Sequence, residues 1–208
     1  MLKNGFIRRG LFAAVTTMAA AAALASPASA GVLTAPALDC QDGAITQPFL
    51  PWRDRDSYKL VRGGALESTP AGWTLRGSAR IVSGNEPWNV RSRGDRRSLL
   101  LPRGSSATTA PVCVGLAEPT LRFFAKKNRG LLSTLVVSVT VKTSLGLEAT
   151  LPIGVLLGNG TWKPTHKFLI VANLLPLLPG DRTPVAFTFT PLLGDWQIDD
   201  VYVDPRMR

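Results

Sequence analysis

Alternating apolar and polar residues fill most of the chain beyond residue 57, and they predict strands rather than helices. From Leu135 to Val141 every second side chain is aliphatic, which is the period of a strand with one buried face. Phe187 and Phe189 alternate with Ala186 and Thr188 in the same way. The runs that predict strands are Tyr58–Arg62, Trp73–Arg76, Ala79–Ser83, Ser98–Leu101, Val112–Val114, Thr120–Ala125, Thr134–Thr143, Glu148–Leu157, Lys167–Val171, Val185–Thr190 and Trp196–Val203.

Glycine and proline clusters separate these runs and predict turns between them. Examples are Gly63-Gly64, Asn128-Arg129-Gly130 and Pro179-Gly180-Asp181. About ten strands joined by turns, with no amphipathic helical repeat between them, indicate an all-β antiparallel sandwich. Residues 58–208 are expected to form this domain, and residues 31–57 an irregular segment packed on it.

The first thirty residues have the three parts of a secretory signal peptide. Lys3, Arg8 and Arg9 precede an apolar run from Leu11 to Leu24, and small residues end at Ala30. The run is shorter than the roughly 20 residues that a membrane span needs. The sequence therefore predicts export and cleavage, by the general or the twin-arginine route, to give a secreted protein with no membrane insertion.

Composition narrows the possible chemistry. The chain has 208 residues, 45% of them hydrophobic, which suits one folded domain. One histidine and two cysteines are too few for a zinc cluster or an iron–sulfur site. Removal of the three basic residues of the leader would reduce the net charge from +10 to +7, so the exported chain stays basic.

The two cysteines, Cys40 and Cys113, both follow the leader. An oxidising compartment favours a disulfide between them. Closing a loop of this length would stabilise the fold by roughly 4 kcal/mol in the chain-entropy view. A catalytic thiol is the weaker reading, because His166 is the sole histidine that could serve as its base.

Catalytic signatures are scarce, and the expectation is a protein that is not an enzyme. A serine hydrolase needs a histidine base, and His166 lies in a polar stretch with no Gly-x-Ser-x-Gly motif in the chain. Glycoside hydrolysis needs only two carboxylates, so an enzyme that acts on sugars stays an alternative, although no pair of carboxylates stands out in the sequence.

Arginines gather at Arg91, Arg93, Arg96, Arg97 and Arg103. Their guanidinium groups could bind an acidic glycan or a phosphate-rich surface, and Arg91 and Arg93 are the ligand candidates among them; a solvated loop is the alternative. No motif that reads nucleic acid is present, and no nucleic-acid partner is expected.

The five tryptophans divide into two groups. Trp73 and Trp196 open strands and are expected in the core. Trp52, Trp88 and Trp162 lie in turn-rich surroundings, where an aromatic ring can stack on the apolar face of a sugar. These three are the candidate ligand platforms, with caps on the end of the sandwich as the alternative.

Motifs at the two ends of the domain resemble the galactose-binding-like jelly roll of carbohydrate-binding modules. They are Gly63-Gly64-Ala65-Leu66-Glu67 with Gly72-Trp73, and the closing stretch from Trp196 to Asp204. Segments such as Phe49-Leu50-Pro51-Trp52 and Gly84-Asn85-Glu86-Pro87 are similar to a group of secreted bacterial proteins with no assigned function. The first resemblance implies a jelly-roll β-sandwich, and the second brings no activity.

The resemblance also implies a structural calcium, because modules of this fold often join an opening glutamate to a closing aspartate through that ion. Glu67 and Asp200, or its neighbour Asp199, are the matching positions. This chain has Leu66 where the modules carry phenylalanine. The alternative is that these carboxylates accept hydrogen bonds from turn amides.

The expected function is a secreted, non-catalytic binding module for an extracellular polysaccharide or cell-wall glycan. A structural or surface-associated protein that contacts other proteins is the alternative.

Overall fold

The computed structural model describes residues 44–115, 120–142, 148–158, 160–170 and 182–204, and strands dominate them. The leader and Cys40 lie outside these residues. Within the described ranges, no helix has the length and apolarity required to cross a membrane. The elements are β1 (Ile45–Thr46), η1 (Leu50–Trp52, a 3-10 turn), β2 (Tyr58–Leu60), β3 (Thr74–Arg76), β4 (Arg80–Ser83), β5 (Arg97–Leu101), β6 (Ser106–Thr108), β7 (Val112–Val114), β8 (Thr120–Lys142), β9 (Glu148–Leu157), β10 (Lys163–Pro164), β11 (Phe168–Leu169) and β12 (Thr183–Val203).

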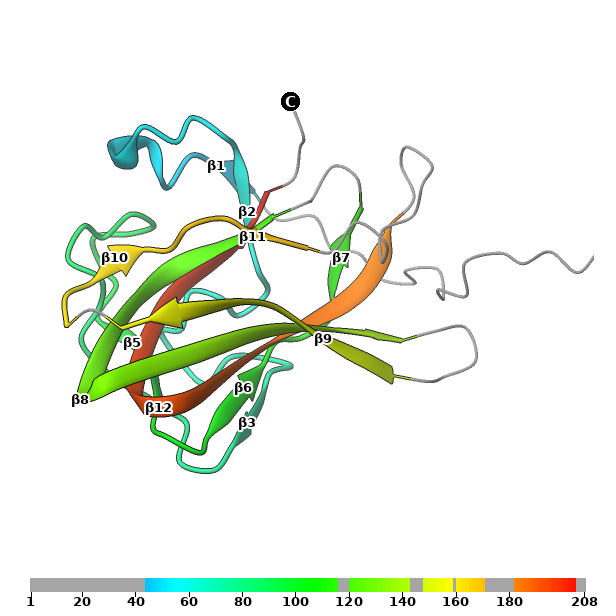
Figure 1. The fold of residues 1–208 in the computed structure, drawn as a ribbon. Helices are drawn as coiled ribbons and strands as arrows, with labels where there is room; N and C mark the ends of the chain where they lie inside the picture. Colours follow the sequence, from blue (N-terminus) through cyan, green and yellow to red (C-terminus); the bar gives the residue numbers. More distant parts are fainter. Residues whose placement is uncertain (1–43, 116–119, 143–147, 159, 171–181, 205–208) are drawn as a thin grey trace, which may run out of the picture. The chain divides into compact units, whose positions relative to one another are not determined.

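Two long antiparallel strands, β8 and β12, form the centre of the fold (Figure 1). Their pairing runs from Val185 opposite Val141 to Val203 opposite Leu121. Each strand joins two segments that the sequence analysis predicted as separate strands. The predicted turn at residues 128–130 is wrong, because the chain bends there without reversing.

Two glycines explain the bend. Gly130 of β8 has φ +101° and Gly194 of β12 has φ +69°, a region that side chains rarely adopt. A Cβ added to Gly130 would lie 3.1 Å from the Cα of Gly194, so the two glycines face each other. The register of β8 and β12 shifts at the same place. The glycines therefore mark a bulged corner at which both strands bend together.

The corner divides the sheet into two layers. In the first layer, the second half of β8 lies between β9 and β12, and β12 continues through β6 to β3. In the second layer, the first half of β8 pairs with β10 and β11, while β12 continues to β5 and β4. β2 and β1 extend the second layer.

The core lies between the layers. Phe123 on the first half of β8 meets Phe189 from the first layer, with 5.0 Å between ring centres. Trp196 is buried, and Trp73 stacks against Phe189, as the sequence analysis expected of both. The alternation predicted for residues 135–141 is confirmed, because Leu135, Val137, Val139 and Val141 are buried and the residues between them are less so.

Three short strands were missed. β6 has one apolar residue, Ala107, which is too little for an alternation signal. β10 contains Pro164, which cannot donate a ladder hydrogen bond and so predicts a turn. β1 is a two-residue strand whose pairing with β2 is set by tertiary contacts.

We predict that Gly194→Ala lowers the free energy of unfolding by about 3 kcal/mol, from left-handed strain and a clash with backbone. The new Cβ would overlap the carbonyl oxygen of Arg129. Gly104→Ala is the matched control, because Gly104 has φ +79° and open space around the Cβ position, so strain alone should cost about 1 kcal/mol. Urea unfolding measures both, and equal losses would contradict the clash.

Candidate functional site

The three candidate platform tryptophans lie around Phe124 on the outer side of the second layer. Trp52 ends η1, and its ring centre is 4.8 Å from that of Trp88 in an edge-to-face pair. The ring centre of Phe124 lies 5.4 Å from that of Trp52 and 5.7 Å from that of Trp88. Trp162 packs on the same aromatic cluster. We call the surface formed by Trp52, Trp88 and Trp162 the tryptophan face.

Trp88 is the most accessible of the three rings, with 43% of its surface exposed. Trp52 and Trp162 are partly buried. Trp162 precedes β10, whose Pro164 pairs with Phe124, and this register brings Trp162 beside Lys126 of β8. The Lys126 Nζ lies 5.0 Å from the ring centre of Trp162, a cation–π contact, and burial lowers the pKa of Lys126.

A small second core supports the tryptophan face. It consists of Phe49, Tyr58, Phe124 and Tyr202, all almost fully buried. Phe124 points outward from β8, so the alternation alone would expose it. The segment before β2 covers it instead, because Phe49 stacks on Phe124 with 5.3 Å between ring centres. The tryptophans therefore rest on a packed apolar floor.

Arg122 of β8 fixes the covering segment to the sheet. Its guanidinium carbon lies 4.2 Å from the ring centre of Phe49, and its Nε donates to the carbonyl of Thr165 at 2.7 Å. Its Nη1 forms an ion pair with Asp54, just after η1. Asp54 also accepts a hydrogen bond from the Tyr58 hydroxyl at 2.6 Å. The position of η1, and with it Trp52, is therefore held from several directions.

Lys167 completes this network. Its Nζ lies 3.3 Å from Asp54 and also pairs with Asp56. Burial raises the pKa of Asp54, but its hydrogen bonds and the two nearby cations outweigh that effect and hold the pKa below its ordinary value. Asp54 is therefore ionised at neutral pH.

Buried carboxylates hold the loop that carries Trp88. Both oxygens of Glu86 accept backbone hydrogen bonds, from Trp88 at 2.6 Å and from Val90 at 2.7 Å. Asp199 of β12 accepts a hydrogen bond from the Glu86 amide at 3.1 Å. Glu86 and Asp199 are both almost fully buried. The carboxylates of Glu86 and Asp199 thus fix this loop onto the sheet by accepting hydrogen bonds from its backbone amides.

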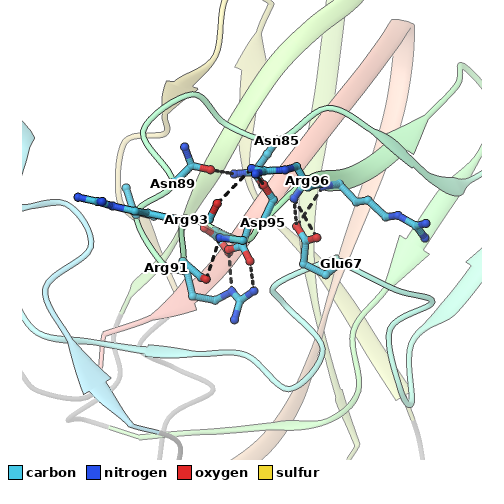
Figure 2. A network of polar contacts seen from close by, with 12 residues as sticks. Glu67, Asn85, Asn89, Arg91, Arg93, Asp95 and Arg96 are labelled. Carbon is cyan, nitrogen blue, oxygen red and sulfur yellow. Dashed lines mark hydrogen bonds and ion pairs between the residues drawn. The ribbon is translucent and has the colours of Figure 1, made fainter.

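Figure 2 shows a second part of the polar network around this loop, which includes Glu67, Arg91 and Asp95. Glu67 accepts hydrogen bonds from the backbone amides of Arg96 and Arg97, each at 3.0 Å. Arg91 forms an ion pair with buried Asp95, and its Nε lies 3.9 Å from Asp200 Oδ1. The Arg91 guanidinium group is therefore engaged with acidic side chains of its own chain.

The buried aspartates of this network, Asp95, Asp199 and Asp200, have raised pKa values. Burial, and then the charge of Asp200, raises the pKa of Asp199 to about 9. Burial, and then the charge of Asp95, raises the pKa of Asp200 to about 8. Both oxygens of Asp200 are buried without a hydrogen-bond partner. The buried pair therefore favours a protonated state at neutral pH.

The predicted calcium ligands lie in this network, but their oxygens do not converge on one point as a ready cage. Glu67 binds two amides, and Asp199 accepts from the amides of Glu86 and Asp200. Of the three predicted ligands, Asp200 has unpaired oxygens, and Asp95 Oδ2 and Asn85 Oδ1 nearby are also buried without a hydrogen-bond partner. Across the residues that the structure describes, no three acidic, histidine or cysteine side chains are arranged to hold a metal ion. Calcium stays a prediction.

The structure also describes Arg93, Cys113 and His166. Arg93 is exposed in the loop between Trp88 and β5. Cys113 is buried in β7, and its predicted partner Cys40 lies outside the described residues, so the disulfide stays a prediction. His166 is exposed and contacts the ring of Phe168, with 4.3 Å between ring centres.

Two surface hollows differ in character. The first, of about 300 Å³, lies on the first layer and is lined by threonines and other residues without an aromatic ring. The second, of about 490 Å³, opens beside Trp52. It is lined by Trp52, Arg53, Asp54, Arg55, Asp56, Arg122 and Lys167. The second hollow combines an aromatic ring with four cations, which makes it the better candidate for a specific ligand.

Sequence reasoning missed Phe124, Arg53 and Arg55. Arg53-Asp54-Arg55-Asp56 is an alternating charge run, which signals solvated surface more than a site. Pro51-Trp52-Arg53, in which a tryptophan adjoins an arginine, is a sequence signal for a ligand site. The larger arginine cluster after Trp88 is the more conspicuous signal, and the sequence analysis takes its ligand arginines from that cluster.

Two solved structures are similar to this chain in fold. One contains the CBM22-1 and GH10 modules of endo-1,4-beta-D-xylanase 10B from Clostridium thermocellum with xylohexaose, at TM-score 0.51 and 17% identity over 69% of this chain and 28% of that chain. The other is the CBM22-1–CBM22-2 tandem domain of Xyn10C from Paenibacillus barcinonensis, at TM-score 0.50 and 12% identity over 83% of this chain and 48% of that chain. This chain spans less than half the length of either.

No protein-family model matches the chain, and no curated sequence matches it significantly. The structural likeness shows the fold, which is the antiparallel jelly-roll sandwich of carbohydrate-binding modules. The prediction of an all-β jelly roll is confirmed.

Proposed function

We propose that the protein is a secreted, non-catalytic module that binds a carbohydrate, an extracellular polysaccharide or cell-wall glycan, at the tryptophan face. The observation that carries the proposal is the meeting of Trp52, Trp88 and Trp162 around Phe124. Three indole rings from separate segments offer flat apolar surface to sugar rings, and the charged residues beside them offer partners for hydroxyl groups.

Two further observations support this function. The fold is that of the CBM22 modules of endo-1,4-beta-D-xylanase 10B, determined with xylohexaose, and of Xyn10C. The acidic side chains beneath the loop hold backbone amides in place, which suits a binding surface better than acid–base catalysis.

The backbone beside the rings supports it as well. Arg53 directly follows Trp52 with φ +61°, and Asn89 directly follows Trp88 with φ +48°. The left-handed conformation of Arg53 costs of order 1 kcal/mol or more, and such strain gathers at functional positions. Asparagine adopts this conformation more readily. Trp52 is thus followed by strained backbone that the surrounding contacts maintain.

The proposal is tested by co-sedimentation of the protein with insoluble xylan, cellulose, chitin and bacterial cell walls. We expect depletion from the supernatant with at least one polymer, because the indole surface is preformed. Heat-unfolded protein is the control for nonspecific adsorption. Binding to none of the polymers, or equal binding by the unfolded control, would contradict the proposal.

Exposed leucines favour a second function, contact with another protein. Leu132 and Leu157 are 78% and 82% exposed, and Leu193 is also exposed. Leu157 and Leu193 both pair with Thr134, so they lie on the two strands that flank β8, near the glycine corner. Apolar surface of this kind is typical of protein interfaces. Concentration-dependent association in sedimentation, abolished by Leu132→Asn with Leu157→Asn, would support this function.

A further inference from the structure

The hollow beside Trp52 carries an excess of positive charge that its own acids do not neutralise. Of the four cations that line it, Arg122 pairs with Asp54, and Lys167 pairs with Asp54 and Asp56. These contacts use both acids of the hollow. Arg53 and Arg55 are exposed, and in the described part of the chain no ion pair reaches either guanidinium.

We propose that the carbohydrate bound at the tryptophan face is anionic, and that Arg53 and Arg55 bind its carboxylate or phosphate groups. This inference rests on the proposed function and names the class of its ligand. A guanidinium group presents a planar fork of donors that matches both anions.

The geometry of η1 places these arginines beside the sugar surface. The 3-10 turn ends with Trp52, and the Arg53 amide donates to the carbonyl of Leu50 at 2.9 Å. The left-handed Arg53 turns the chain directly after the indole. An anionic sugar stacked on Trp52 therefore meets a cationic wall built from the following residues, in a hollow of about 490 Å³ that can admit a ligand.

The rest of the tryptophan face has the same sign. Lys126 lies over Trp162, and burial lowers its pKa, so its charge is poorly solvated. A bound anion would compensate that charge. The net charge, +10 for the full chain and +7 without the three basic residues of the leader, adds a long-range attraction for polyanions. The local arrangement and the overall charge thus favour the same ligand class.

The test compares polymers that share a backbone and differ in charge. Polygalacturonate is paired with its methyl ester, and carboxymethylcellulose and cellulose phosphate are paired with hydroxyethylcellulose, all at 150 mM salt. We expect at least tenfold tighter binding to the charged member of at least one pair. Preference for carboxymethylcellulose or for cellulose phosphate distinguishes a carboxylate from a phosphate ligand.

Variants separate a site from general attraction. Arg53→Gln with Arg55→Gln should remove the preference for the charged polymer, whereas Arg76→Gln with Arg80→Gln, which removes the same charge from exposed positions on β3 and β4, should retain it. Arg53→Gly should weaken binding while the melting temperature stays equal or rises, because glycine relieves the left-handed strain.

Four outcomes would overturn the inference. Equal binding to charged and neutral polymers would do so while leaving the proposed function in place. An equal loss in both double variants would show nonspecific attraction only, and tighter binding to single-stranded DNA than to every polysaccharide would assign the surface to nucleic acid. Binding to no polymer in any pair would also overturn the inference, whereas the proposed function is decided separately by co-sedimentation with xylan, cellulose, chitin and cell walls.

Discussion

Trp88→Ala is expected to weaken polysaccharide binding about thirtyfold, which corresponds to ~2 kcal/mol. Trp88 is the most exposed ring of the tryptophan face, and its contacts with Trp52 and Phe124 hold it in one orientation. A ring that is already ordered loses little conformational freedom when a ligand stacks on it. Affinity electrophoresis or titration calorimetry with the polymer identified by co-sedimentation measures the effect.

Two controls isolate the aromatic contribution. Trp88→Phe retains an aromatic surface and should lose much less affinity than Trp88→Ala. Leu169→Ala removes an exposed apolar side chain from β11 and should leave binding unchanged. The melting temperature of Trp88→Ala should fall by only a few degrees, because the ring is 43% exposed. Unchanged affinity in a folded Trp88→Ala variant would remove Trp88 from the site.

Asp200→Asn is expected to raise the free energy of unfolding at pH 7.5 by about 2 kcal/mol, measured in chelator. Asp200 is buried with two unpaired oxygens and lies near Asp95 and Glu86, whose charges raise its pKa. Asparagine has nearly the same shape and no charge, and it tolerates the φ of +45° found here. The loss of the 3.9 Å contact with Arg91 offsets a part of the gain.

The same substitution should change the pH dependence of stability. The folded-state pKa values of about 8 and about 9 for Asp200 and Asp199 lie above the unfolded value of about 3.9. Between those limits the folded state binds more protons, so stability falls as pH rises from about 4 toward 8. Asp200→Asn should flatten that fall.

Urea unfolding at a series of pH values measures this dependence. Asp195→Asn is the control, because Asp195 accepts a hydrogen bond from the Arg103 amide and lies outside the acidic network. Destabilisation by Asp200→Asn in chelator, or an unchanged slope, would contradict the protonated pair.

The strand pattern was readable from sequence because it is local. Val137, Val139 and Val141 alternate with Ser138 and Thr140, and period two assigns these valines to the core without knowledge of any partner strand. The merging of predicted strands into β8 and β12 was not readable. Gly130 within a polar stretch predicts a turn, and only its contact with Gly194 on the partner strand makes it a corner.

The candidate site is built by contacts between segments that are distant in sequence. For this reason some of its residues could be predicted from the sequence and others could not. Tryptophans in turn-rich sequence could be selected, but their meeting depends on the cover over Phe124 and on the register of β10. Arg91 was selected with Arg93 as a ligand residue, and the structure shows Arg91 engaged with Asp95 and Asp200. Asp200 lies on β12, far from Arg91 in the sequence, so the contact between Arg91 and Asp200 could not be predicted from the sequence.

The indole N–H resonances of the five tryptophans test the central claim most directly. In ¹⁵N-labelled protein titrated with a soluble oligosaccharide of the bound polymer, we predict shifts for Trp52, Trp88 and Trp162. The resonances of Trp73 and Trp196 should stay in place, because Trp196 is buried in the core and the Trp73 Nε1 donates to the carbonyl of Arg62 at 2.7 Å. Shifts confined to Trp73 and Trp196, or binding without any indole shift, would contradict a ligand surface at the tryptophan face.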